Sequence, residues 1–298
     1  MIKIERNEFN LIGLIALSLL FLSLNSILCK IALVNNYIDA YSFTFFRVFF
    51  AFLTLVLLLA FRENKKSEFK LKKINLKNNW LSSFMLFLYA IGFSYSYLNL
   101  EAGFGTLLLF TAVQLTMLIS SLFFKEKINL NKLIGIVLAF TGLVYLLYPS
   151  GDFAISYFHL FLMIISGIAW GIYSVIGKAT SDALFITYDN FLKALFFTCM
   201  FFIFVSFESL NFSLEGIMLS FLSGSITSAI GYVIWYKVLP KITIVTASIL
   251  QLLVPVIAIV LSVAFLEEVF TMKLLIATLL VSLAVFISVI KKEFNQNT

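Results

Sequence analysis

Ten runs of apolar residues, each close to the length needed to cross a membrane, divide the 298-residue sequence. A helix needs about 20 residues to cross a hydrocarbon core about 30 Å thick. Lipid cannot satisfy an open sheet edge, and the runs lack the two-residue alternation of a barrel strand, so each run should be a helix. The sequence predicts an all-α integral membrane protein with ten transmembrane helices. The expected spans are residues 11–34, 41–61, 80–99, 102–124, 133–148, 155–176, 184–207, 217–239, 242–266 and 272–290.

The sequence gives little support to an enzyme. The sole histidine, His159, has no carboxylate partner or metal-ligand spacing around it, and no glycine-rich phosphate loop occurs. Cys29 and Cys199 stand alone in different spans, so we expect core packing rather than a metal site or a disulfide. The first span has no small-residue cleavage site after it, so we expect a retained helix rather than a signal peptide. We therefore expect no catalytic residue, no metal and no cofactor.

The placement of basic residues predicts the orientation in the membrane. With the N-terminus inside, 17 of the 21 Lys and Arg residues fall in cytoplasmic segments, and the outer loops keep only Lys273. Cytoplasmic loops generally carry this excess of positive charge. Both termini should therefore lie in the cytoplasm, and the expected location of the protein is the cell inner membrane. The net charge of +6 then reflects the orientation in the membrane rather than a nucleic-acid-binding surface.

Residues 113–146 and 255–288 align without a gap at a constant shift of 142 residues. In each copy an apolar run ends at a glutamate, crosses a short polar turn and resumes. Five expected spans separate the copies, so the second copy enters the membrane from the opposite side. The sequence predicts two inverted five-helix repeats, residues 1–150 and 151–298, an arrangement typical of transporters with substrate bound near the midplane. The identities are Ser120/Ser262, Phe123/Phe265, Glu126/Glu268, Leu133/Leu275, Ile134/Ile276 and Leu138/Leu280.

Several short motifs carry a family resemblance over nearly the whole chain. They are Lys30 at the end of the first span, the sequence FTFFR at 43–47, the two glutamate turns with Leu-Ile-Gly or Leu-Ile-Ala after them, and QLLVP at 251–255. Together they resemble the EamA branch of the drug/metabolite transporter superfamily. The resemblance implies a ten-span permease for small metabolites such as amino acids, often exported. One departure is Gln114, which adds a polar group in a span where many relatives carry a proline.

Charged residues inside the expected spans are candidates for gating or charge coupling, because burying them in lipid is costly. Asp189 and Lys193 stand four residues apart and should form an ion pair on one helix face, with a coupling role as the alternative. Lys30 and Lys178 lie near opposite surfaces and suit gates or structural anchors. Arg47 suits either helix packing or an anion site. We expect Glu126 and Glu268 to be matched turn anchors at opposite faces.

Neutral polar and aromatic side chains near the middle of the spans are candidates for the wall of a substrate cavity. A ring with a polar edge offers both apolar contact and a hydrogen bond, although Tyr and Trp also populate membrane interfaces. The candidates are Asn25, Ser94, Tyr95, Tyr97, Thr111, Gln114, Trp170, Tyr173, Ser223, Tyr232, Trp235, Tyr236, Ser248 and Gln251.

These observations favour a secondary transporter that moves a small organic metabolite, an amino acid being one option, by alternating access. An anionic phosphorylated metabolite or nucleotide derivative is an alternative substrate, but its binding needs several cations to converge. A lipid flippase is a second alternative. A membrane acyltransferase would require a cluster of His and Asp that the sequence lacks. The expected partners are the small-molecule substrate and the bilayer, with the chain as a monomer or a homodimer.

Overall fold

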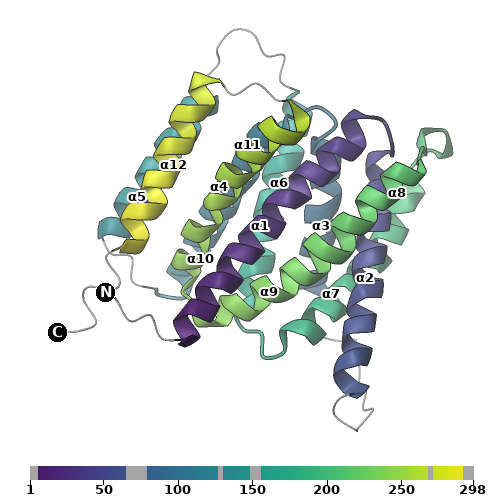
Figure 1. The fold of residues 1–298 in the computed structure, drawn as a ribbon, viewed down its shortest axis with the longest axis horizontal. Coiled ribbons are helices and arrows are strands. Elements are labelled where there is room, and N and C mark those ends of the chain that lie inside the picture. Colours follow the sequence, from purple (N-terminus) through teal and green to yellow (C-terminus); the bar gives the residue numbers. More distant parts are fainter. Residues whose placement is uncertain (1–5, 65–78, 127–129, 148–155, 268–270, 291–298) are drawn as a thin grey trace.

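The computed structural model describes residues 6–64, 79–126, 130–147, 156–267 and 271–290, and this part of the chain is almost wholly helical (Figure 1). An isolated antiparallel bridge joins Ile38 to Phe212. The α-helices are α1 (Arg6–Val34), α2 (Ala40–Asn64), α3 (Trp80–Ser96), α4 (Ala102–Phe123), α5 (Leu130–Leu147), α6 (Tyr157–Gly177), α7 (Ala183–Phe201), α8 (Leu214–Phe221), α9 (Gly231–Val238), α10 (Ile244–Gln251), α11 (Leu253–Leu266) and α12 (Met272–Ile290). The other helical segments are η1 (Phe202–Phe204), η2 (Phe207–Ser209), η3 (Leu222–Ile230) and η4 (Leu239–Lys241).

Within the described residues, seven helical segments are long and apolar enough to cross a membrane. Two further expected spans, 80–99 and 133–148, correspond to shorter apolar helices, Trp80–Ser96 and Leu133–Gly142. At a rise of about 1.5 Å per residue, a helix of fewer than 18 residues is shorter than the hydrocarbon core. The seven segments are Asn10–Val34, Ala40–Arg62, Ala102–Phe123, Tyr157–Gly177, Ala183–Phe204, Leu214–Lys241 and Ile244–Leu266.

Helices from the two halves of the sequence interleave in one bundle. In the first half, α3 and α4 both pack on α6 of the second half, and α1 packs on α9 and α11. Helix α2 packs on α7 and η3, while α5 and α12 pair along one side of the bundle (Figure 1). Helix α1 begins and α12 ends at the same end of the bundle (Figure 1). The centre of the molecule is therefore an interface between the halves rather than the core of either one.

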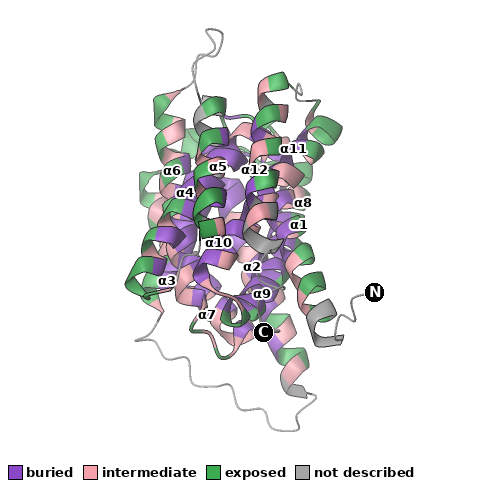
Figure 2. Cartoon of the chain, turned by 90° about the vertical axis from the view of Figure 1, so that its left-hand side faces the viewer, coloured by how far each residue is buried: buried purple, intermediate pink, exposed green. Residues whose placement is uncertain are grey.

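Exposed residues lie on the outside of the bundle and buried residues lie toward its interior (Figure 2), and many of the exposed residues are large and apolar. Phe123, Tyr157 and Phe204 are each more than 80% exposed. Soluble proteins rarely expose contiguous apolar patches of this kind, and lipid would cover them. The prediction of core packing is met by Cys29, which is buried, but is wrong for Cys199, which is exposed on this outer surface.

Two long helical segments, α8–η3–α9 and α10–α11, depart from regular α-helical winding. Helices α8 and α9 are joined by η3, a π-helix of nine residues, and this type of segment often marks functional sites. Helices α10 and α11 are separated by a break at Leu252. Pro255 explains the break, because proline has no N–H for the carbonyl of residue 251 and its ring crowds that carbonyl. Both irregular segments lie in the second half of the chain.

The α4–α6 contact is close because α6 presents two glycines. A Cβ atom at Gly171 would stand 2.8 Å from Cβ of Thr116, and one at Gly167 would stand 2.6 Å from Cβ of Ala112. Both distances are shorter than real Cβ contacts, so only glycine allows this approach. The small-xxx-small pattern at 167–171 therefore packs α6 on α4, as such patterns do between membrane helices.

Candidate functional site

A group of polar and aromatic side chains fills the middle of the interface between the halves. We call this group the central cluster, and none of its members is more than 3% exposed. Its members come from α1, α2 and α3 in the first half and from α6, η3, α9 and α10 in the second. The central cluster consists of Asn25, Arg47, Tyr89, Trp170, Tyr173, Ser228, Tyr232, Tyr236 and Gln251.

Arg47 of α2 is the only charged member of the central cluster. Its Nε donates to Oγ of Ser228 at 3.0 Å, and its Nη2 donates to the Tyr232 hydroxyl at 2.7 Å and to the Tyr89 hydroxyl at 3.3 Å. The guanidinium also lies 5.3 Å from the ring centre of Tyr89 and 5.2 Å from that of Phe93, within cation–π range. Its Nη1 has no hydrogen-bond partner. The arginine thus joins α2 to α3, η3 and α9 through neutral groups.

Asn25 of α1 gathers the hydroxyl groups of the π-helix η3. Its Oδ1 accepts from Ser223 Oγ at 2.8 Å, from Thr227 Oγ1 at 2.5 Å and from Ser228 Oγ at 3.4 Å. Its Nδ2 has no partner. Ser228 links the two main polar residues, because its Oγ accepts from Arg47 and donates to Asn25.

Trp170 of α6 is the aromatic centre of the cluster. Its ring lies 4.9 Å from that of Tyr89, 4.7 Å from that of Tyr232 and 5.3 Å from that of Tyr173, measured between ring centres. Its indole Nε1 donates to Oε1 of Gln251 at 2.7 Å. Gln251 is the last residue of α10, so the acceptor of the Trp170 indole lies directly before the helix break.

Tyr173 and Tyr236 extend the cluster toward α7. Their rings stack at 4.8 Å, and the Tyr236 hydroxyl donates to the backbone oxygen of Tyr173 at 3.0 Å. The Tyr173 hydroxyl and Nδ2 of Asn190 have no partner. Oδ1 of Asn190 accepts from Ser83 at 3.3 Å. This side of the cluster therefore also holds polar atoms whose hydrogen-bonding capacity is unused.

The structure brings together seven of the residues expected in the cavity wall: Asn25, Trp170, Tyr173, Ser223, Tyr232, Tyr236 and Gln251. A further candidate, Gln114, is buried on α4 one turn before Met117, whose sulfur accepts from Gln251 Nε2 at 3.1 Å. Nε2 of Gln114 has no partner. Gln114 therefore lies beside the cluster.

The other expected wall residues lie outside the central cluster and make packing contacts. Ser94 accepts from Thr44 at 2.8 Å between α2 and α3, and Trp235 donates to Ser174 at 3.2 Å. Half-buried Tyr95 packs its ring on Phe201. Three hydroxyl groups bond to neighbours in sequence: Tyr97 to Thr106 at 2.8 Å, Thr111 to the Leu107 carbonyl at 2.8 Å and Ser248 to the Val245 carbonyl at 2.8 Å.

The expected ion pair between Asp189 and Lys193 is present. Lys193 Nζ lies 2.7 Å from Asp189 Oδ2, and both side chains are only 3% exposed. Oδ2 also accepts from Asn79 at 3.0 Å, and the ammonium lies 5.6 Å from the Trp80 ring centre. Two lysines at helix ends bond to backbone carbonyls: Lys30 to Tyr97 at 3.0 Å and Lys178 to Ile242 at 2.6 Å. These contacts join the two lysines to backbone carbonyls just beyond α3 and η4.

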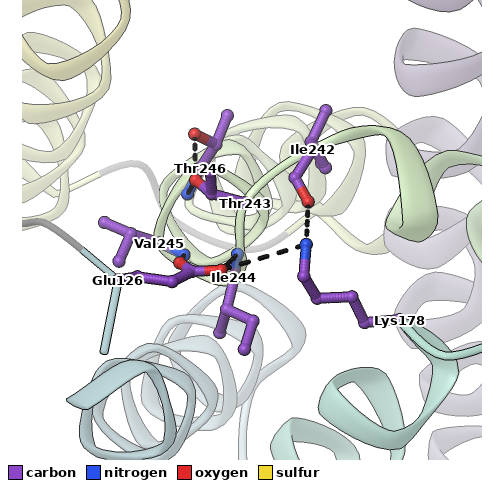
Figure 3. A network of polar contacts seen from close by, with 7 residues as sticks. All are labelled: Glu126, Lys178, Ile242, Thr243, Ile244, Val245 and Thr246. Carbon is purple, nitrogen blue, oxygen red and sulfur yellow. Dashed lines mark hydrogen bonds and ion pairs between the residues drawn. The ribbon is translucent and has the colours of Figure 1, made fainter. Parts of the chain in front are cut away.

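Glu126 reaches across to the second half of the chain and caps α10 (Figure 3). Its two carboxylate oxygens accept from the backbone N–H groups of Ile244 at 2.9 Å and Val245 at 3.2 Å. Lys178 Nζ stands 3.9 Å from the same carboxylate. A negative charge is favoured at a helix N-terminus. Glu126 therefore joins the halves as well as ending its own turn, while the predicted counterpart Glu268 lies outside the described residues.

The opposite end of the bundle also carries contacts between the halves. Asp39 caps α2 by accepting from Ser42 N at 2.9 Å, and its second oxygen accepts from Asn211 N at 2.9 Å. The backbone adds two bonds, from Asp39 N to the Asn211 carbonyl at 2.8 Å and from Ser213 N to the Tyr37 carbonyl at 2.7 Å. The central cluster is thus enclosed between two cross-linked ends.

Sequence reasoning missed Tyr89, Ser228 and Asn190. The repeat gave no signal for Tyr89, because its shift of 142 aligns Tyr89 with Gly231 rather than with Tyr232, whose hydroxyl it meets at 3.3 Å. Ser228 belongs to a polar stretch, residues 223–228, whose π-helical winding decides which hydroxyls face Asn25. Asn190 offered no signal beyond its amide group in an apolar helix.

Comparison with known proteins agrees with this architecture. The EamA-like transporter family matches residues 10–148 and, a second time, residues 158–290. An uncharacterised protein of Pseudomonas aeruginosa is 38% identical over 246 residues, which cover 82% of each chain. An uncharacterised transporter of Bacillus subtilis is 24% identical over 83% of this chain and 86% of its own.

Two further matches extend the comparison. An uncharacterised transporter of Archaeoglobus fulgidus is 27% identical over 70% of this chain and 77% of its own. One crystal structure covers 92% of this chain and 98% of its own with a TM-score of 0.68 at 15% identity, which shows the same fold. With its two family matches and its apolar helices, this multi-pass membrane protein belongs to the EamA-like transporter family.

Proposed function

We propose that the protein is a secondary transporter of the cell inner membrane that moves a small organic metabolite, with amino acids as the first class to test. Two inverted five-helix repeats, residues 1–150 and 151–298, would rock about the central cluster and expose it to each side in turn. Ten spans place both termini in the cytoplasm. Family membership supports transport as the activity.

The observation that carries this proposal is the contact between the broken helix α10–α11 and Trp170. Discontinuous helices at the interface of two repeats are where many transporters bind substrate. Gln251 lies at the break and bonds to the indole that three tyrosine rings surround. Aromatic rings with a few placed polar groups suit contact with a small organic molecule.

Three observations support the inverted repeat. The family matches the chain twice in succession. Helix α1 begins and α12 ends at the same end of the bundle (Figure 1). Tyr89 of α3 and Tyr232 of α9, one from each half, both bond to the Arg47 guanidinium. These features fit a pseudo-two-fold axis that passes near the central cluster.

Reconstitution of the purified chain into liposomes tests the proposed function. We expect accumulation of at least one labelled amino acid above protein-free liposomes, from a panel of amino acids, sugars and nucleotides assayed with and without a pH gradient. A panel in which no compound enters faster than in protein-free liposomes would contradict the proposal.

Gln251→Leu is expected to reduce transport of the identified substrate at least tenfold. The leucine leaves the buried indole N–H of Trp170 without its acceptor, which costs about 1–3 kcal/mol, and about 1.4 kcal/mol corresponds to a tenfold change. The matched control is Thr141→Val, because that hydroxyl bonds only to the Val137 carbonyl on α5. Equal initial rates for Gln251→Leu and wild type, at equal protein per liposome, would show that the cluster does not contact substrate.

A further inference from the structure

We propose that Arg47 binds a single negative charge on the transported molecule, so that the substrates are small organic molecules with one anionic group, carboxylates foremost. This inference rests on the proposed function, in which the central cluster holds the transported molecule, and it names the substrate class of that site. It also assigns Asn25 as the second donor to the anionic group.

No carboxylate among the residues that the structure describes pairs with the charge of Arg47. The side chain is 1% exposed, whereas Arg62, Lys178 and Lys193 each have an acidic partner. Its hydrogen bonds go to hydroxyl groups of Tyr89, Ser228 and Tyr232, all neutral. Burial of an uncompensated ion costs several kcal/mol, which hydroxyl dipoles and ring faces offset only in part. An anionic ligand would supply the missing charge.

Two unused donor groups flank Ser228. Nη1 of Arg47 and Nδ2 of Asn25 have no partner, although both side chains are held in place through their other polar atoms. Ser228 bonds to both side chains, because its Oγ accepts from Arg47 and donates to Asn25. A carboxylate has two oxygens with several acceptor sites, and a guanidinium presents its donors in a fork that matches it. One carboxylate can therefore accept from both residues.

The same surroundings limit the charge that the site can hold. Arg47 is the one cation of the central cluster, and the nearby charge of Lys193 is already neutralised by Asp189 at 2.7 Å. Lys30 and Lys178 bond to backbone carbonyls of Tyr97 and Ile242. A single cation matches a carboxylate better than a phosphate monoester, which carries up to two charges. The rings of Trp170 and its tyrosine neighbours would contact the uncharged part of the ligand.

Binding measurements with pairs of ligands that differ by one charge test this site without a transport assay. The purified chain in lipid nanodiscs is titrated with phenylacetate, L-phenylalanine and L-leucine, each against its primary amide, and with phenyl phosphate. We expect at least one carboxylate to bind at least tenfold more tightly than its amide and than phenyl phosphate. No carboxylate preference in any pair would overturn the proposal, and a preference for phenyl phosphate would replace it with a phosphate site.

Two variants test whether the preference for a carboxylate over its amide arises at Arg47 and Asn25. Arg47→Gln should bring the carboxylate and amide affinities within twofold of each other, whereas the control Arg62→Gln should leave their ratio unchanged. Because Arg47→Gln also removes contacts between four helices, Asn25→Asp gives an independent reading. The aspartate keeps an oxygen that accepts from the hydroxyl groups of η3, and its charge gives Arg47 a counter-ion beside Ser228. Asn25→Asp should therefore abolish the carboxylate preference and raise the unfolding temperature. A preference that survives in Asn25→Asp or in a folded Arg47→Gln would overturn the proposal.

The failures of the site and of the proposed function are distinguishable. If carboxylates bind through Arg47 but no compound enters liposomes, the transport proposal fails and the anion site stands. If neutral molecules are transported at a rate that Arg47→Gln does not change, the anion site fails and the transport proposal stands.

Discussion

Asp189→Leu is expected to lower the free energy of unfolding by about 3–5 kcal/mol, the usual loss when one partner of a buried ion pair is removed. The Lys193 ammonium would then remain buried beside Trp80, with a ring face in place of a carboxylate. The measurement is the unfolding free energy from titration with sodium dodecyl sulfate in mixed micelles. Lys193→Met should have a smaller effect, because Asp189 keeps the amide of Asn79 as a donor.

The double variant Asp189→Leu/Lys193→Met separates a structural pair from a coupling pair. Replacing both charges by apolar groups of similar volume is often nearly neutral, so its stability should return to within about 1 kcal/mol of wild type. Arg62→Met is the matched control, since Arg62 and Asp182 are also 2.7 Å apart but are 33% and 22% exposed. It should cost less than about 1 kcal/mol. A stable double variant that has lost all transport would contradict the structural interpretation.

Glu126→Ala should weaken the contact between the halves at the end of the bundle where α10 begins. The alanine removes two charge-assisted bonds to the N–H groups of Ile244 and Val245, each worth about 1.5–3 kcal/mol when the acceptor is ionised. We expect those two amides to exchange with deuterium at least tenfold faster and the transport rate to fall at least tenfold. We expect both effects because, without the cap, the two halves no longer stay in contact at this end of the bundle.

Glu215→Ala is the control for the cap. Glu215 also stands in the first turn of a helix, but it is exposed, and Ser213 already caps α8 by accepting from Gly216 N at 3.2 Å. An exposed charge of this kind contributes little, because solvent and salt screen it. Unchanged exchange at Ile244 and Val245 in Glu126→Ala would show that the carboxylate does not hold α10.

Local rules explain the predictions that the structure confirms. The pairing of Asp189 with Lys193 needs only the helical period, which places residues four apart on one face. The apolar runs required helices because backbone groups in lipid must be satisfied within the segment. Glycine at 167 and 171 allows α6 to approach α4 closely through its small size alone.

The features that sequence reasoning did not reach depend on contacts between distant residues. The capping of α10 by Glu126 joins groups 118 residues apart, and nothing near position 126 specifies that helix. In an ideal α-helix Ser223 and Thr227 share a face but Ser228 lies about 140° away from Ser223. The π-helix η3 brings Ser228 to the same atom of Asn25 as the other two hydroxyl groups. That no residue in the described part of the chain supplies a counter-ion to Arg47 becomes visible only when its neighbours in space are known.

Alternating access to the central cluster is the central claim, and native Cys29 allows its most direct test. Cys29 is fully buried on α1, one helical turn beyond Asn25, and Cys199→Ser removes the exposed thiol. A membrane-impermeant methanethiosulfonate reagent is applied to right-side-out and to inverted vesicles. We predict that Cys29 is modified from both sides and that the transported substrate slows both reactions. Modification from one side only, whether substrate is present or not, would contradict the account.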